Sequence, residues 1–201
     1  MAKLSRNREK YSMKKISVVI VAGFFFLSCQ NKLTKVEEVK FKEKGAEIAQ
    51  SATKELGSNL MSSMKEGGVE AAIPFCHASA LIITEKKAKE YQAEIKRISH
   101  KIRNPKNKPS EEDTEILKKF ISLVESNTAL EPVVQKDKDN RIVFYSPILM
   151  QKQCLACHGS PGMELAVRTD SILKSYYPED QATGFKEGEL RGMWKITFKN
   201  E

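Results

Sequence analysis

Two cysteines and a histidine stand close together in the sequence, at Cys154-x-x-Cys157-His158. In this motif each thiol can add across one vinyl group of a porphyrin, and the histidine that follows binds the iron beneath it. The spacing places both sulfurs on the same side of the turn. The motif therefore predicts covalent attachment of one haem c through Cys154 and Cys157, with His158 as the proximal iron ligand.

Three other interpretations of the motif compete with haem attachment. A redox dithiol would need a βαβ context near the start of a helix, which the sequence does not predict here. A tetrahedral zinc site would need a fourth ligand, which Cys76 or His77 could supply. The third alternative is a pair of structural cysteines with a histidine beside them by chance.

The N-terminus has the composition of an export signal, and 201 residues suit one domain plus such a leader. Basic residues precede a twelve-residue apolar run at 16–27, which is shorter than the ~20 residues that span a bilayer. Cys29 follows as in a bacterial lipoprotein signal, where this cysteine is lipidated and becomes the mature N-terminus. An uncleaved anchor helix and an ordinary secretory signal are the alternatives. We expect a signal peptide over 1–28, a tether over 29–38, and a domain over 39–201 held to a bacterial membrane, in the periplasm or at the cell surface.

Removal of the signal changes the charge and the cysteine count. The formal charge is +8 from 34 Lys+Arg and 26 Asp+Glu, but residues 1–28 hold six basic residues and Glu9, which leaves 28 against 25 and a net charge of +3. The remaining charged stretches are mixed in sign, so nothing supports a nucleic-acid groove. A free thiol in an oxidising compartment needs a role. With Cys29 lipidated and the motif cysteines paired, Cys76 is left without one.

The periodicity of the chain predicts an α+β domain, because helices come first and antiparallel strands with helices between them follow. A helix from Val39 ends at Gly67-Gly68, and Pro74 gives the next helix a kink or a late start. The predicted later elements are a strand at 93–102, a capped helix from Ser110, a hairpin at 132–150, a short helix at 169–177 and a strand at 193–198.

Three stretches resemble a family of exported c-haem proteins with a PAS-like domain. They are FYSPILMQKQCLACHGSP at 144–161, YYPEDQATGFKEGELRGMW at 176–194 and IRNPKNKPSEED at 102–113. The family was formerly catalogued as a domain of unknown function, and a cyanobacterial photosystem-associated haem protein is its structural example. The resemblance covers roughly 39–198. It implies N-terminal helices packed on a PAS-like antiparallel sheet that encloses a covalently attached haem.

The resemblance also implies the second iron ligand. The family carries a cysteine on an N-terminal helix, after an Ala-Ile step, that binds the iron opposite the histidine, and AAIPFCHASA places Cys76 there. His77 is the alternative, and only one of the two can face the iron because adjacent helical residues point about 100° apart. Met150, Met163, Met193 or an open site are the remaining alternatives.

Four further residues are candidates for the pocket. Arg97 and Arg103 lie in or beside a stretch that resembles the family's arginine-containing segment, and haem propionates favour arginine forks. The alternative for these arginines is a solvated basic strand. Tyr145 and Tyr177 are candidates for lining the pocket, although ordinary core packing explains an aromatic residue equally well.

A haem ligated by His158 and a Cys76 thiolate should be six-coordinate and low-spin, with a low reduction potential. Such a haem fits a membrane-tethered sensor of redox state or of a small gas, acting on an unidentified signalling or redox protein. The alternative is a one-electron carrier, a cytochrome c, at the membrane surface. An enzyme is least favoured, and no catalytic residue is predicted, because no acid–base pair is visible around an open distal site.

Overall fold

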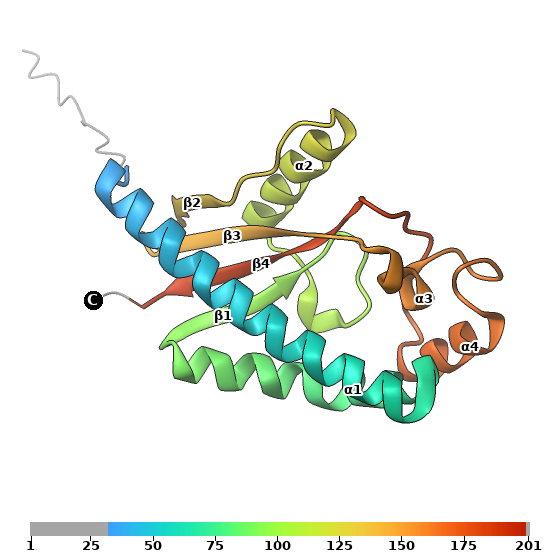
Figure 1. The fold of residues 1–201 in the computed structure, drawn as a ribbon. Coiled ribbons are helices and arrows are strands. Elements are labelled where there is room, and N and C mark those ends of the chain that lie inside the picture. The colour runs from blue at the N-terminus through green and yellow to red at the C-terminus, as the bar shows by residue number, and fades with distance from the viewer. Residues whose placement is uncertain (1–31, 200–201) are drawn as a thin grey trace, which may run out of the picture. The chain divides into compact units, whose positions relative to one another are not determined.

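The longest element is the helix α1 (Lys35–Glu90), in a computed structural model that describes residues 32–199. Its backbone departs from helical geometry at Gly67 and at Gly68, where φ is 77°, a value that glycine adopts without strain. The chain turns sharply there, so α1 consists of two limbs that run back along each other (Figure 1). Glu55 joins the limbs through ion pairs of 3.1 Å to Lys86 and 3.0 Å to Lys87. The predicted break between two helices is confirmed.

α1 begins earlier than the sequence pattern predicted. Thr34 forms a capping box with Glu37, whose carboxylate accepts from the Thr34 backbone N–H at 2.8 Å, so the first helical residue is Lys35 rather than Val39. The last residues of the expected tether are therefore helical. The expected signal peptide and Cys29 lie outside the described residues.

Four strands form one antiparallel sheet. They are β1 (Ala93–Ile98), β2 (Val133–Lys136), β3 (Ile142–Leu149) and β4 (Leu190–Phe198), in the order β1-β4-β3-β2. The last strand of the chain therefore lies in the middle of the sheet. The predicted β2–β3 hairpin is confirmed, and Asn140 in its turn has a φ of 61°. β1 is shorter than the predicted strand because the chain bends away after Ile98.

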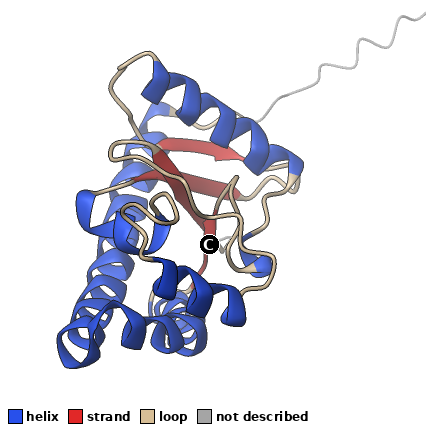
Figure 2. Cartoon of the chain, turned by 90° about the vertical axis from the view of Figure 1, so that its right-hand side faces the viewer, coloured by secondary structure: helices blue, strands red, loops and turns tan. Residues whose placement is uncertain are grey.

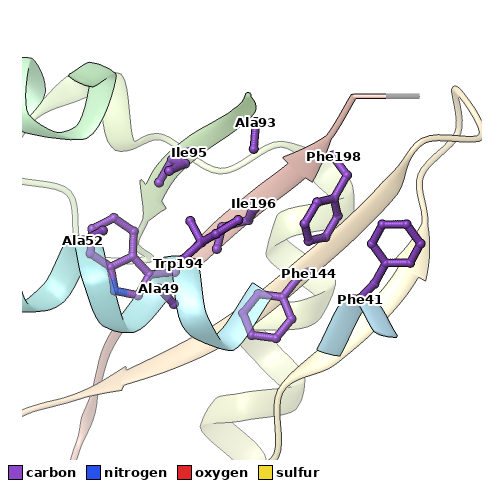
Figure 3. Close-up of a cluster of buried hydrophobic side chains, with 10 residues drawn as sticks. Phe41, Ala49, Ala52, Ala93, Ile95, Phe144, Trp194, Ile196 and Phe198 are labelled. Carbon is purple, nitrogen blue, oxygen red and sulfur yellow. The ribbon is translucent and has the colours of Figure 1, made fainter. Parts of the chain in front are cut away.

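Helices cover both faces of the sheet (Figure 2). The first limb of α1 covers one face, with a core that includes Ala49, Phe144 and Trp194 (Figure 3). The helix α2 (Glu111–Glu125), capped by Ser110 as predicted, covers the other face and buries Phe120. Successive residues of a strand point to opposite faces, so β3 and β4 contribute to both cores. The fold is α+β.

The segment between β3 and β4 holds the cysteine–histidine motif. A 3₁₀ turn (Lys152–Cys154) leads into the four-residue α3 (Leu155–His158), and the helix α4 (Val167–Tyr176) follows. The residues at 169–177 were predicted to be helical, and α4 confirms most of that range. α3 and α4 lie beyond one end of the sheet, and α4 lies beside the turn of α1 (Figure 1). This end of the sheet is where the predicted site residues gather.

Candidate functional site

A cavity lies among α1, the ends of β1 and β4, α4 and the cysteine–histidine motif. About 960 Å³ between its walls is not filled by atoms, and part of this space is open to solvent. Seven predicted site residues line it, namely Cys76, Arg97, Arg103, Cys154, Cys157, His158 and Tyr177. Apolar walls come from Leu60, Met64, Ala72, Ile73, Ala80 and Leu173, and the other polar lining residues are Asn104, Asn107, Gln153 and Arg191.

Cys154 and Cys157 enter the cavity from the 3₁₀ turn and from α3. Both side chains are half-buried, and both are free thiols, as is Cys76. Burial raises the pKa of the Cys157 thiol, although Arg103 acts in the opposite direction. Among residues 32–199 every strand pairing is antiparallel, and α3 has only four residues. The βαβ context of a redox dithiol is therefore missing from the described part of the chain.

His158 is held in one orientation by the chain that leads into β4. Its Nδ1 lies 2.7 Å from the carbonyl oxygen of Ala182, so Nδ1 carries the proton and Nε2 is left as a lone-pair donor. Burial lowers the pKa of His158 well below its usual value, and Arg191 and Arg103 act in the same direction. The imidazole is therefore neutral, which is the form that binds a metal.

Arg103 ties the motif to the same chain segment. Its Nε and Nη2 donate to one oxygen of Asp180, at 3.0 and 2.9 Å, and the Asp180 side chain is only 2% exposed. Nη2 also donates to the carbonyl oxygens of Cys157 at 2.6 Å and of Ala182 at 3.2 Å. Although Arg103 lines the cavity as predicted, its donors hold the motif against residues 180–182.

Arg97 and Arg191 differ from Arg103 in that neither is paired with a carboxylate of the described residues. Arg97 lies 6.0 Å from the ring centroid of Trp194, and Arg191 donates from Nη1 to Ser99 Oγ at 2.6 Å and to the Lys101 carbonyl at 3.2 Å. No carboxylate among residues 32–199 forms an ion pair with either of them. Burial, together with Arg103 and Arg97, lowers the pKa of Arg191 to about 9, so it remains a cation at neutral pH. Sequence reasoning missed Arg191, although it lies in one of the stretches that carry the family resemblance.

Cys76 lies on the second limb of α1, on the same helical face as Ala72, Ile73 and Ala80, which also line the cavity. Burial raises the pKa of its thiol, and Arg97 and Arg103 oppose that shift. His77 is exposed and does not line the cavity; its ring lies 5.3 Å from that of Tyr176 and 5.1 Å from that of Tyr177. Of the two neighbours, Cys76 is the one that faces the cavity.

Of the remaining predicted residues, only Tyr177 lines the cavity; the others in the described part of the chain lie outside it. Met150 and Met193 are buried in other clusters, and Met163 is 76% exposed. Tyr145 does not line the cavity, because the alternation along β3 turns it toward α2, where its hydroxyl donates to Asp113 at 3.2 Å. Tyr177 is buried at the cavity wall, and burial raises the pKa of its hydroxyl.

The zinc alternative finds no support in the described residues. Nowhere in 32–199 do three or more His, Cys, Asp or Glu side chains come together in a group that could hold a metal ion. The sulfur and nitrogen donors instead stand around a large space. Such an arrangement suits an extended ligand that several walls contact at once.

Comparisons with known proteins agree with this description. A family model described as Tll0287-like matches residues 28–198. The crystal structure of the cyanobacterial haem protein Tll0287 is similar to this chain, with 25% sequence identity and a TM-score of 0.57, over 84% of this chain and 98% of that one. No curated protein sequence matches the chain.

Proposed function

Because this chain belongs to the Tll0287-like family, we propose that it is a c-type haem protein with one haem attached to Cys154 and Cys157. The solved relative is described as a haem protein, which supports haem binding in general. The residues that the family model matches, 28–198, include the cysteine–histidine motif. The antiparallel sheet with its helices then corresponds to the PAS-like domain that surrounds the haem.

One observation carries the proposal: Cys76 and the motif residues, which lie about eighty positions apart in the sequence, line the same cavity. The residues fit the group. Two free thiols can form the thioether bonds, and a neutral histidine whose Nδ1 is already hydrogen-bonded can bind iron through Nε2. The apolar walls from α1 and α4 suit the faces of the ring, and the arginines suit its carboxylates.

Cys76 is the second iron ligand in this proposal. An anionic sulfur donor stabilises ferric iron, so the reduction potential should be low. We propose that the limb that carries Cys76 also moves. Gly67 and Gly68 interrupt the helix before it, and Pro74, two residues away, has no N–H to bond to the preceding turn. If a weak iron–sulfur bond at Cys76 breaks, the limb that carries Cys76 could therefore shift.

This mobility favours a sensor of redox state or of a small gas, whose output is the position of the second limb of α1. The alternative is a one-electron carrier, and the observation that favours it is the opening of the cavity to solvent, which would expose a haem edge to a redox partner. An enzymatic role is not proposed, since among residues 32–199 no Asp or Glu lines the cavity to form an acid–base pair with a histidine.

The chain is proposed to work outside the cytoplasm, anchored by a lipid on Cys29 and in contact with a signalling or redox protein. α1 contains a stretch that is long and apolar enough to cross a membrane, with a mean hydropathy of 1.3, but the core helix of a domain can pass the same test. That stretch is 22% buried. Buried residues of the first limb pack against the sheet, and Ile73 of the second limb packs against Leu165, Leu173 and Tyr177. We therefore assign α1 to the domain and not to the anchor.

A visible spectrum and a pyridine haemochrome of the full chain, produced in a host that matures c haems, test the proposal. We expect a haem that stays with the polypeptide after denaturation. The Cys154→Ala/Cys157→Ala variant should release its haem under the same conditions, and Met163→Ala, an exposed change near the motif, should not. A chain that carries no haem in that host would contradict the proposal.

A further inference from the structure

We propose that Arg97 and Arg191 bind the two carboxylates of the haem, while Arg103 positions the motif instead; this assignment rests on the proposed function. It changes the sequence-based expectation, which paired Arg97 with Arg103, and it gives a role to a residue that sequence reasoning had not selected.

The charges around the cavity support the assignment. Three guanidinium groups line it, and Asp180 neutralises Arg103 through a buried ion pair. In the described part of the chain, no Asp or Glu lines the cavity, so two positive charges have no counter-ion there from residues 32–199. A charge that is removed from water and left unpaired is costly, and proteins place such groups where a ligand of opposite charge binds. A haem carries two carboxylates, which is the number required.

The hydrogen bonds of the three arginines also separate Arg103 from Arg97 and Arg191. Arg103 uses Nε and Nη2 on three protein groups. Arg191 uses only Nη1 on protein, so Nε and Nη2 have no acceptor among residues 32–199. Within that range the Arg97 side chain has no hydrogen-bond acceptor, and its guanidinium contacts the Trp194 ring. The free edges of Arg97 and Arg191 can therefore each form the paired contact that a guanidinium makes with a carboxylate.

Both arginines are already oriented. The Arg97 guanidinium lies over Trp194, whose indole Nε1 donates to Thr53 Oγ1 at 2.9 Å and so fixes the ring. Arg191 is fixed by Ser99 and by the Lys101 carbonyl. A guanidinium that is held before binding loses less rotational freedom when the carboxylate arrives.

The sheet places the two arginines at one edge of the cavity. Arg97 lies near the end of β1, and Arg191 lies near the start of β4, which pairs with β1 as Arg97 opposite Trp194. The two carboxylates of a haem also leave one edge of the ring. This match predicts that the carboxylate edge of the haem faces the ends of β1 and β4.

The test compares two ligands in the full chain with Cys154→Ala and Cys157→Ala, so that porphyrins bind reversibly. The ligands are ferric protoporphyrin and its dimethyl ester, which has no carboxylate charge. We expect Arg97→Gln and Arg191→Gln each to weaken ferric protoporphyrin binding about tenfold, corresponding to about 1.4 kcal/mol, and to leave ester binding unchanged. The control Arg168→Gln, at a side chain that is 82% exposed, should change neither affinity.

Arg103→Gln separates positioning from carboxylate binding, because a displaced motif weakens both ligands by the same factor and leaves their affinity ratio unchanged. If Arg97→Gln or Arg191→Gln also leaves that ratio unchanged, the carboxylate assignment is overturned while haem binding stands. If the parent chain binds neither porphyrin, the proposed function fails first. The Arg97→Lys and Arg191→Lys variants keep the positive charge and should recover part of the preference for ferric protoporphyrin over its ester. This recovery would show that the loss in the glutamine variants is not caused by misfolding.

Discussion

The Nδ1 atom of His158 lies 2.7 Å from the carbonyl oxygen of Ala182, and this contact joins the cysteine–histidine motif to the chain segment that leads into β4. The same segment contributes two backbone bonds, from the Gly184 N–H to the Gly159 carbonyl at 2.9 Å and from the Phe185 N–H to the His158 carbonyl at 3.0 Å. The 180–185 segment thus forms a support that fixes the histidine ring and its backbone together.

Loss of Arg103 should loosen this support. Arg103→Ala leaves the buried Asp180 carboxylate without its cation, which typically costs about 3–5 kcal/mol of unfolding free energy. Denaturant unfolding of the haem-loaded chain measures the loss, with Arg168→Ala at an exposed ion pair as the control expected to change stability by less than about 0.5 kcal/mol. A loss for Arg103→Ala no larger than that of the control would contradict the positioning role.

Two glycines of the first limb of α1 should respond in opposite ways to alanine. A Cβ on Gly45 would collide with the ring of Phe144, so Gly45→Ala should destabilise the domain by about 1–3 kcal/mol. A Cβ on Gly57 would meet nothing within 4 Å, so Gly57→Ala should stabilise it by up to about 1 kcal/mol through helix propensity. Thermal unfolding of the two variants tests the packing of this limb on the sheet, and equal effects would be inconsistent with it.

Stability should depend on pH through Asp113. Burial alone would raise the pKa of this carboxyl, but bonds from Lys195 and Ser110 outweigh burial and hold the pKa below its usual value. The unfolded state therefore binds the proton more readily, and the stabilisation is present above the unfolded pKa of about 3.9 and is lost as the pH falls through the lower folded value.

Asp113→Asn should accordingly be less stable than the parent at pH 7, and the difference should shrink below about pH 4. Unfolding free energies measured from pH 2 to pH 7 test this. Glu115→Gln changes an exposed carboxyl on the same helix, and its unfolding free energy should match that of the parent at every pH. If the difference in unfolding free energy between Asp113→Asn and the parent stays constant with pH, the proposed contribution of this carboxylate is contradicted.

Carbon monoxide distinguishes the two proposed roles. If the protein is a sensor, the reduced form should bind the gas, and hydrogen exchange should rise in residues 69–80 of the second limb but not in the sheet-packed first limb. Cys76→Ala, which has no sulfur to displace, should bind the gas faster than the parent. A reduced parent that binds no gas, with unchanged exchange in both limbs, would favour the electron carrier and contradict sensing.

Local patterns in the sequence predicted most of the fold. The glycine pair marked the turn of α1, Ser110 marked the start of α2, and two apolar runs joined by a charged turn with Asn140 marked the hairpin. The start of α1 was placed too late, although Thr34 and Glu37 carry the spacing of a capping box. Tyr145 was wrongly predicted to line the pocket, because the sequence of a strand does not show which face of the sheet will border the cavity and which will be covered by a helix.

Several residues that meet at the cavity could be selected from the sequence, either because their motif is local or because the cysteine count left one cysteine without a role. The motif identified Cys154, Cys157 and His158, and the odd cysteine drew attention to Cys76. The roles of the arginines were not predictable in this way. Asp180, which forms the ion pair with Arg103, is 77 residues away in the sequence. That no carboxylate among residues 32–199 pairs with Arg191 appears only once the chain is folded.

The central claim is that Cys76 and His158, from distant parts of the chain, bind one iron from opposite sides, and the absorption spectrum of two matched variants tests it most directly. Cys76→Ser should shift the ferric Soret and visible bands of the haem-loaded protein, because the sulfur ligand is lost. His77→Ala, at the exposed neighbouring position, should leave the ferric spectrum unchanged. An unchanged spectrum for Cys76→Ser, or a shift for His77→Ala alone, would contradict the claim.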